Sequence, residues 1–211
     1  MCSDFKLQKG VSMIETLIIF PIVLMIALWI IHIGLVYQAR ANLEYAALMG
    51  ARVGSVSSID IDRMQAEIAR RLAASQVGST PVNPGDIVIT VLNPTRPMFS
   101  DCGVPPSDAS VDCGAGLANC EIPNFGLQFR STSAACGVVG SNPGVNIQDA
   151  NLLRIQVSYQ FDSKIPFMNM PLFPRDASDT DGSVGTEVTA VATVRMQTPA
   201  RITTANESAI P

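Results

Sequence analysis

One carboxylate, Glu15, lies at the start of a long apolar run. Residues 16–39, which follow it, contain no Asp, Glu, Lys or Arg. A charged side chain near the middle of a membrane helix costs about 2.5–3.5 kcal/mol on insertion scales. Glu15 therefore requires a partner, a path to water or a specific function.

Side chains suited to catalysis are sparse. The only histidine, His32, lies in the apolar run, and the sequence has no P-loop, G-x-G-x-x-G or G-x-S-x-G motif. No carboxylate pair stands out from the expected strands and loops. We predict that the protein is not an enzyme and needs no cofactor, and we interpret His32 as a helix-contact or interfacial residue rather than a proton relay.

Four of the five cysteines gather in one stretch after the apolar run. They are Cys102, Cys113, Cys120 and Cys136, with no histidine nearby and no C-x-x-C spacing. This pattern favours two disulfides over a zinc site or a redox motif, and so places this part of the chain outside the cytoplasm. Three pairings are possible, and the sequence does not select among them.

An acidic stretch near the C-terminal end has some features of a calcium loop. With Gly182 at the sixth position, Asp179 and Asp181 fit, but the first and twelfth positions are Ala177 and Val188. We interpret this stretch as a solvated turn and predict no metal site.

The element expected to position Glu15 is a long helix from residue 11 to about residue 54. At 1.5 Å per residue, its apolar part gives about 36 Å, enough to cross a hydrocarbon core of ~30 Å. No small-residue cleavage site follows, so we expect the anchor to be retained. Gly50 and Gly54 are expected to end or loosen the helix.

The rest of the chain predicts an α+β domain. A second, amphipathic helix begins near Asp60, the expected N-cap. Alternating β-branched and polar residues then predict strands over 86–92, 152–161 and 186–196, with loops between them. We expect a small antiparallel sheet covered by a helix on one face, with a disulfide-stapled loop, as in pilins. The net charge of −4 gives no support to nucleic-acid binding.

The start of the chain resembles the processing site of type IV prepilins. A short basic head ends in Gly10 and is followed by "VSMIET" and the apolar helix. The resemblance implies that a membrane-embedded prepilin peptidase cuts between Gly10 and Val11, and that Glu15 is the glutamate retained at the fifth position of the mature chain. The new amine would lie about 6 Å of helix rise from Glu15, so the carboxylate would neutralise it within the chain or on the next subunit.

The longer segment "GVSMIETLIIFPIVLMIALWIIHIGLVYQARANLEYAALMGARVGSV" resembles the TadE-like family, minor pilins or pseudopilins of tight-adherence (Flp) pili. It combines Glu15 with Pro21, with Tyr37 at the end of the apolar run and with a Gly-Ala-Arg motif at 50–52. The resemblance covers roughly residues 8–56. The cysteine-rich insertion and His32 depart from the family pattern.

These features together predict three regions. Residues 1–10 are a leader peptide, residues 11–56 a transmembrane and assembly helix, and residues 57–211 a periplasmic or extracellular α+β domain whose Cys-rich loop spans 93–149. The expected location is the bacterial inner membrane, with the N-terminus cytoplasmic and the domain periplasmic, and then the extracellular pilus.

The resemblance implies a minor pilin or pseudopilin that primes or tips the pilus, because the extramembrane domain is large for a repeating subunit. Its expected partners are the prepilin peptidase, other minor and major pilins, the inner-membrane assembly platform and membrane lipid. Two alternatives stay open: a pilus-mounted adhesin that binds a surface or glycan through the Cys-rich loop, and a plain unprocessed single-pass membrane protein.

Overall fold

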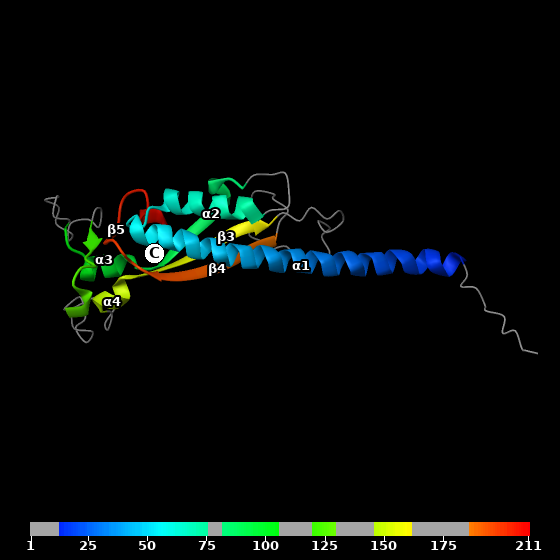
Figure 1. The fold of residues 1–211 in the computed structure, drawn as a ribbon, viewed down its shortest axis with the longest axis horizontal. Helices are drawn as coiled ribbons and strands as arrows, with labels where there is room; N and C mark the ends of the chain where they lie inside the picture. Colours follow the sequence, from blue (N-terminus) through cyan, green and yellow to red (C-terminus); the bar gives the residue numbers. More distant parts are fainter. Residues whose placement is uncertain (1–12, 76–81, 106–119, 130–145, 162–185) are drawn as a thin grey trace, which may run out of the picture.

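The computed structural model describes residues 13–75, 82–105, 120–129, 146–161 and 186–211. Its first element is α1 (Met13–Val56), a single helix of 44 residues. Figure 1 shows that the N-terminal half of α1 projects beyond the body of the molecule, whereas the C-terminal half lies along it. The predicted long helix is therefore confirmed, with its end two residues later than expected.

Helix α1 runs without interruption through Gly50 and Gly54, so the expectation that these glycines end or loosen it is wrong. They serve close packing instead. A Cβ atom on Gly50 would lie 2.5 Å from Cγ1 of Ile68, and one on Gly54 would lie 2.6 Å from the sulfur of Met64. Two glycines four residues apart lie on one face of a helix, where they let a second helix come close.

That second helix is α2 (Ile61–Ser75), which follows α1 after a short turn. The Asp60 carboxylate accepts a hydrogen bond of 3.2 Å from the backbone N–H of Arg63, as expected of an N-cap. Met64, Ile68 and Leu72 form the buried face of α2, each at most 3% exposed. Apolar burial on that single face is what holds α2 against α1.

The main sheet has three antiparallel strands in the order β1-β3-β4. They are β1 (Ile87–Asn93), β3 (Leu152–Phe161) and β4 (Thr186–Arg195), so the three predicted strands are confirmed. A short 3₁₀ turn, η1 (Pro84–Asp86), leads into β1. Helices α1 and α2 contact the same sheet, α1 against β3 and β4 and α2 against β1.

A second group of elements lies at the end of the molecule opposite the N-terminus of α1 (Figure 1). It contains α3 (Arg96–Cys102), β2 (Glu121–Ile122), η2 (Leu127–Phe129), α4 (Ile147–Ala150), β5 (Ala200–Arg201) and η3 (Glu207–Ala209). Strand β2 pairs with β5 in a separate two-stranded sheet. The stretch 93–149, which was expected to be a Cys-rich loop, thus has regular structure in its described parts, namely three short helical segments and a strand.

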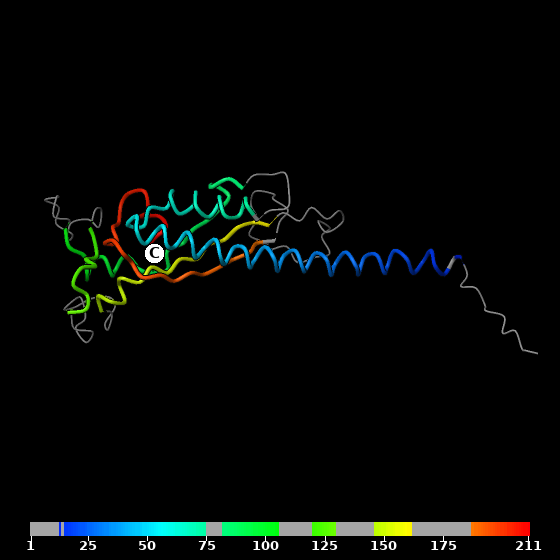
Figure 2. Tube along the Cα trace, in the orientation of Figure 1, coloured from blue at the N-terminus to red at the C-terminus, as the bar shows by residue number. Residues whose placement is uncertain are grey.

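These short elements form because apolar side chains within them join the core. Phe99 and Ile122 are both 0% exposed, and both belong to the core that α1 and the main sheet share. Burying such side chains removes them from water at about 25 cal/mol per Å² of apolar surface. The C-terminal segment, residues 196–211, then returns to the end of α1, as Figure 2 shows by its red and cyan traces.

Candidate functional site

The N-terminal half of α1 is a bare apolar rod. Large side chains on every side of it are exposed, including Leu17, Phe20, Val23 and Ile30, which are 56–70% exposed. Among the described residues one helix is long and apolar enough to span a membrane, and none of its most apolar 18-residue window is buried. An apolar helix with most of its large side chains exposed requires lipid or other apolar helices as its surroundings.

Glu15 lies in the first turn of this rod and is exposed. The positive end of the helix dipole favours a carboxylate at that place. Gly10 and Val11, the predicted processing site, lie outside the described residues, so the distance between Glu15 and the amine stays a prediction.

His32 lies in the middle of the apolar half. It is half-buried, as are Leu28 and Val36 one turn before and one turn after it, whereas Trp29 and Tyr37 are exposed. The half-buried residues recur at intervals of four, so they share one stripe of the helix.

The cysteines lie at the opposite end of the molecule. Cys102 ends α3 and Cys120 precedes β2; both are buried and both are disulfide-bonded. Cys113 and Cys136 lie outside the described residues, as do Asp179 and Asp181. The pairing of the four cysteines, and the stapling of the loop that it would cause, stay predictions.

Two residues in the turn between α1 and α2 take a left-handed conformation. The turn, residues 57–60, is here named the elbow; φ is +57° at Ser58 and +66° at Ile59. A β-branched residue rarely has positive φ, because its side chain crowds the backbone. Ile59 keeps it because its side chain is fully buried and its N–H donates a 3.0 Å hydrogen bond to the carbonyl of Gly54.

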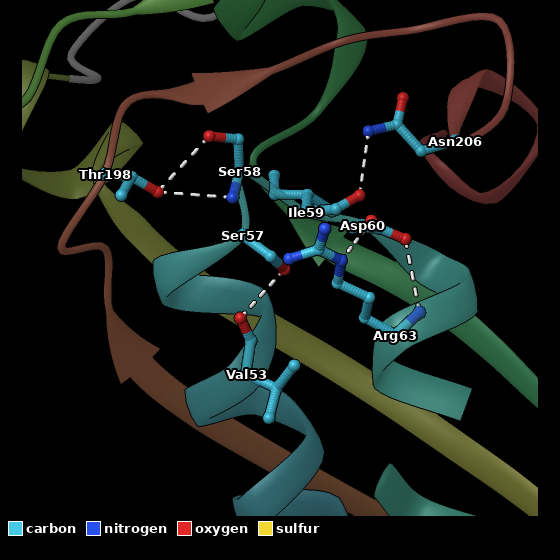
Figure 3. A network of polar contacts seen from close by, with 8 residues as sticks. All are labelled: Val53, Ser57, Ser58, Ile59, Asp60, Arg63, Thr198 and Asn206. Carbon is cyan, nitrogen blue, oxygen red and sulfur yellow. Dashed lines mark hydrogen bonds and ion pairs between the residues drawn. The ribbon is translucent and has the colours of Figure 1, made fainter. Parts of the chain in front are cut away.

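The C-terminal segment clasps the elbow (Figure 3). The Thr198 hydroxyl accepts a hydrogen bond of 3.2 Å from the N–H of Ser58 and donates one of 3.1 Å to the carbonyl of Ser55. The Asn206 amide donates hydrogen bonds of 2.9 Å to the carbonyls of Ile59 and Arg201. The bonds to Ser55, Ser58 and Ile59 connect parts of the chain 140–147 residues apart, and they hold α2 at its angle to α1.

Asn206 is 2% exposed, and its Oδ1 atom also accepts a 2.7 Å hydrogen bond from the N–H of Thr203. Both ends of its amide are therefore used inside the protein. Sequence reasoning missed this residue. The available signal was weak, since an asparagine after a Thr-Thr-Ala run reads as an ordinary turn.

The outer face of α2 carries one ionic cluster. The Glu67 carboxylate lies 2.8 Å from Nε of Arg71 and 2.6 Å from Nη2 of Arg70. Hydrogen bonds from Arg71 first, and then from Arg70, lower the pKa of Glu67 below its ordinary value of 4.5. The Arg71 guanidinium also lies 5.9 Å from the centre of the Tyr45 ring on α1, a second link between the helices.

Helix α1 has three distinctive features: an exposed apolar half, a carboxylate in its first turn and a contact with α2 through small residues. Residues 10–52 match the family model described as TadE-like protein. The match confirms the resemblance over nearly the whole of α1. No curated protein matches the chain, and no solved structure matches it.

The TadE-like match indicates a protein associated with tight-adherence pili. It favours a structural role over an enzymatic one, in agreement with the scarcity of catalytic side chains. Within the described residues no three His, Cys, Asp or Glu side chains are grouped so that they could hold a metal ion. The long apolar helix fits a single-pass membrane protein.

Proposed function

We propose that the protein is a minor pilin or pseudopilin that takes part in priming or tipping a tight-adherence pilus. The observation that carries the proposal is the contrast within α1, whose N-terminal half leaves most of its large apolar side chains exposed, whereas its C-terminal half is packed into the core. A subunit stored in a membrane and then transferred to a helical assembly needs such a surface, because both surroundings are apolar.

Glu15 is the residue that we propose guides this transfer. Cleavage between Gly10 and Val11 would create an amino group near the start of α1, and Glu15 lies in the first turn of that helix. An ion pair in apolar surroundings is strong in Coulomb terms but costly to desolvate, so its net effect is geometric. It sets the axial register of the packed helices.

The first experiment is the intact mass of the chain recovered from membranes, with and without the prepilin peptidase. A chain that begins at Val11 only when the peptidase is present supports the proposal. Retention of residues 1–10 in both strains would reduce the protein to an unprocessed single-pass membrane protein.

A second experiment tests the role of Glu15 apart from processing. Glu15→Ala is expected to be cleaved normally but to leave fewer pili, whereas Thr16→Ala, one residue later in the same turn, serves as the matched control. Normal piliation by Glu15→Ala would remove its proposed role and leave processing unaffected.

The adhesin alternative has one observation in its favour. Phe125 and Phe129 are 71% and 85% exposed, and their segment lies at the end of the molecule farthest from the N-terminus of α1. Exposed aromatic rings suit contacts with sugars or apolar surfaces. Deleting residues 100–136 would also remove the core residue Ile122, so the sharper variant is Phe125→Ser with Phe129→Ser. An adhesin would then lose attachment with pili still present.

A further inference from the structure

The two edges of the main sheet differ in how they are protected. The outer edge of β1 is guarded: the side-chain amide of Gln65 on α2 donates a 2.9 Å hydrogen bond to the carbonyl of Ile87, and β1 is interrupted by a bulge between Val91 and Asn93. Pro94 follows the strand directly. Bulges, prolines and covering helices are the usual means by which proteins block an edge strand.

The outer edge of β4 has neither a bulge nor a proline, although α1 packs on one face of the strand. All ten of its residues pair with β3 in an unbroken register from Thr186 to Arg195, and it contains no proline and no bulge. Among the described residues, the backbone of β4 makes hydrogen bonds to β3 alone. An edge of this length, roughly 33 Å, is a template for another strand.

The register identifies which backbone groups of β4 face outward. The side chain of Asn93 on β1 donates to the carbonyl of Leu152, so that carbonyl points toward β1. The backbone N–H and C=O groups alternate in direction along a strand, so those of Leu153, Ile155 and Val157 in β3 are directed toward β4. The backbone groups of their partners Val194, Ala192 and Ala190 are directed toward β3. The N–H and C=O groups of the residues between them, Thr189, Val191 and Thr193, therefore face the open edge.

The hydrogen bond from Gln65 to the carbonyl of Ile87 gives the same alternation independently. This carbonyl points away from β3, so the partner of Ile87, Tyr159, directs its own backbone groups toward β4. Tyr159 pairs with Val188, which must then face β3. Both observations assign Glu187, Thr189, Val191, Thr193 and Arg195 to the open edge.

The side chains at this edge determine which residues a pairing strand must carry. Glu187 at one end and Arg195 at the other are oppositely charged and exposed, and Val191 between them is 50% exposed. On the other face, α1 covers the buried residues Ala190 and Ala192. The fitting strand carries a basic residue opposite Glu187, an acidic residue opposite Arg195 and an apolar or β-branched residue opposite Val191.

The direction of α1 indicates which protein supplies the added strand. Strand β4 runs in the same direction as α1, because Gln197 and Thr198, just beyond β4, bond to Ser55 near the end of α1. A second copy could match the charges only by running its β4 antiparallel, with Glu187 against Arg195. That arrangement would point the two α1 helices in opposite directions, which two copies inserted alike in one membrane cannot adopt.

We propose that the open edge of β4 receives an extended strand from a different subunit of the same assembly. The inference rests on the proposed function, which places such subunits beside α1. The added strand extends the three-stranded sheet to four and binds mainly through backbone hydrogen bonds, with the terminal charges setting its register.

The edge is tested first on the full chain in detergent micelles. The probe is a capped peptide with the sequence of residues 186–195, "TEVTAVATVR", which has no anchor and so is free to run antiparallel. At a free concentration ten times its Kd, it is expected to slow deuterium uptake at the outward amides of β4 about tenfold. The amides of Ala190 and Ala192 are expected to be slow with or without it.

The matched control is a peptide of identical composition in which the Glu and Arg residues are exchanged, so that like charges face each other. Equal protection by both peptides would overturn the charge matching. Unchanged uptake with either peptide at millimolar concentration would overturn the open edge. A full chain that is already dimeric and protected over β4 before any peptide is added would overturn the choice of a different subunit.

The neighbour is tested in cells with Val191→Pro, which removes an outward N–H without breaking the ladder to β3, against Val191→Thr, which keeps it. The proline variant is expected to be processed normally but absent from sheared pili, and the threonine variant present. Normal incorporation of the proline variant would overturn the proposal. If neither the wild-type chain nor Val191→Pro is processed, the result counts against the proposed function instead. If Val191→Pro does not accumulate, the peptide result decides.

Discussion

The two halves of α1 obey the same backbone geometry but have opposite surroundings. The half before Arg40 presents large apolar side chains on all sides, and most of them are exposed. The half after it carries small residues on one face, and Ala46, Ala47 and Ala51 are fully buried against the rest of the chain. The large apolar side chains of the first half can be buried only in lipid or in an assembly. The small-residue face of the second half is buried against its own domain.

The comparison predicts that equal substitutions have unequal effects in the two halves. Leu43 is fully buried and Leu24 is 49% exposed. Leu43→Ala should lower the free energy of unfolding of the extramembrane domain by about 3 kcal/mol, because it leaves a cavity. Leu24→Ala should change it by less than about 0.5 kcal/mol. Denaturant unfolding of the full chain in micelles measures both, and an equal loss would abolish the distinction between the halves.

A second pair of substitutions adds volume instead of removing it. Gly50→Val should destabilise the domain by about 2–3 kcal/mol, since a Cβ there would lie 2.5 Å from Ile68. Gly34 has nothing within 4 Å of such an atom. Gly34→Val should therefore leave the thermal midpoint of the domain unchanged, and a similar fall for both variants would show that the α1–α2 contact is not the cause.

Hydrogen bonds from Thr198 and Asn206 hold the elbow, where the packed C-terminal half of α1 ends. Asn206→Ala should cost about 2 kcal/mol, because it leaves the buried carbonyl of Ile59 without its side-chain donor. The exposed Thr204, replaced by Ala, is the matched control. Hydrogen exchange at the N-terminus of α2 should accelerate in the Asn206 variant. Unaltered exchange there would mean that apolar packing alone holds the elbow.

The smallest expected effect concerns pH. The pKa of the Glu67 carboxyl is lowered in the folded chain, so its pairing with Arg71 and Arg70 stabilises the fold above the ordinary value of 4.5. That contribution is lost as the pH falls through the lowered pKa. It should be below about 1 kcal/mol, because the arginines are partly exposed.

Comparing Glu67→Gln with Glu44→Gln sharpens this prediction. Glu44 pairs with Arg40, and both side chains are more than half exposed at 57% and 64%. Unfolding curves at pH 7 and pH 3.5 should differ less for Glu67→Gln than for the wild type, while Glu44→Gln should follow the wild type. If the three proteins show the same pH dependence, the cluster contributes nothing measurable to stability.

Sequence periodicity located α1, α2 and the three strands of the main sheet to within two residues, because each has a strong repeat of its own. It failed where structure depends on distant partners. Phe99 and Ile122 fold parts of the 93–149 stretch by entering a core made elsewhere, and no local pattern around them announces it. Asn206 and Thr198 find their partners at the elbow only after the chain returns.

Sequence alone determined the apolar span, the place of Glu15 at its start and the resemblance to TadE-like proteins, because charge and hydropathy are properties of residue order. Only the tertiary structure decided that Gly50 and Gly54 are contact points rather than helix ends, and that β1 is guarded while β4 is open. Those outcomes depend on which groups lie opposite one another in space, and hydrogen-bond and steric complementarity between remote segments is not written in either segment by itself.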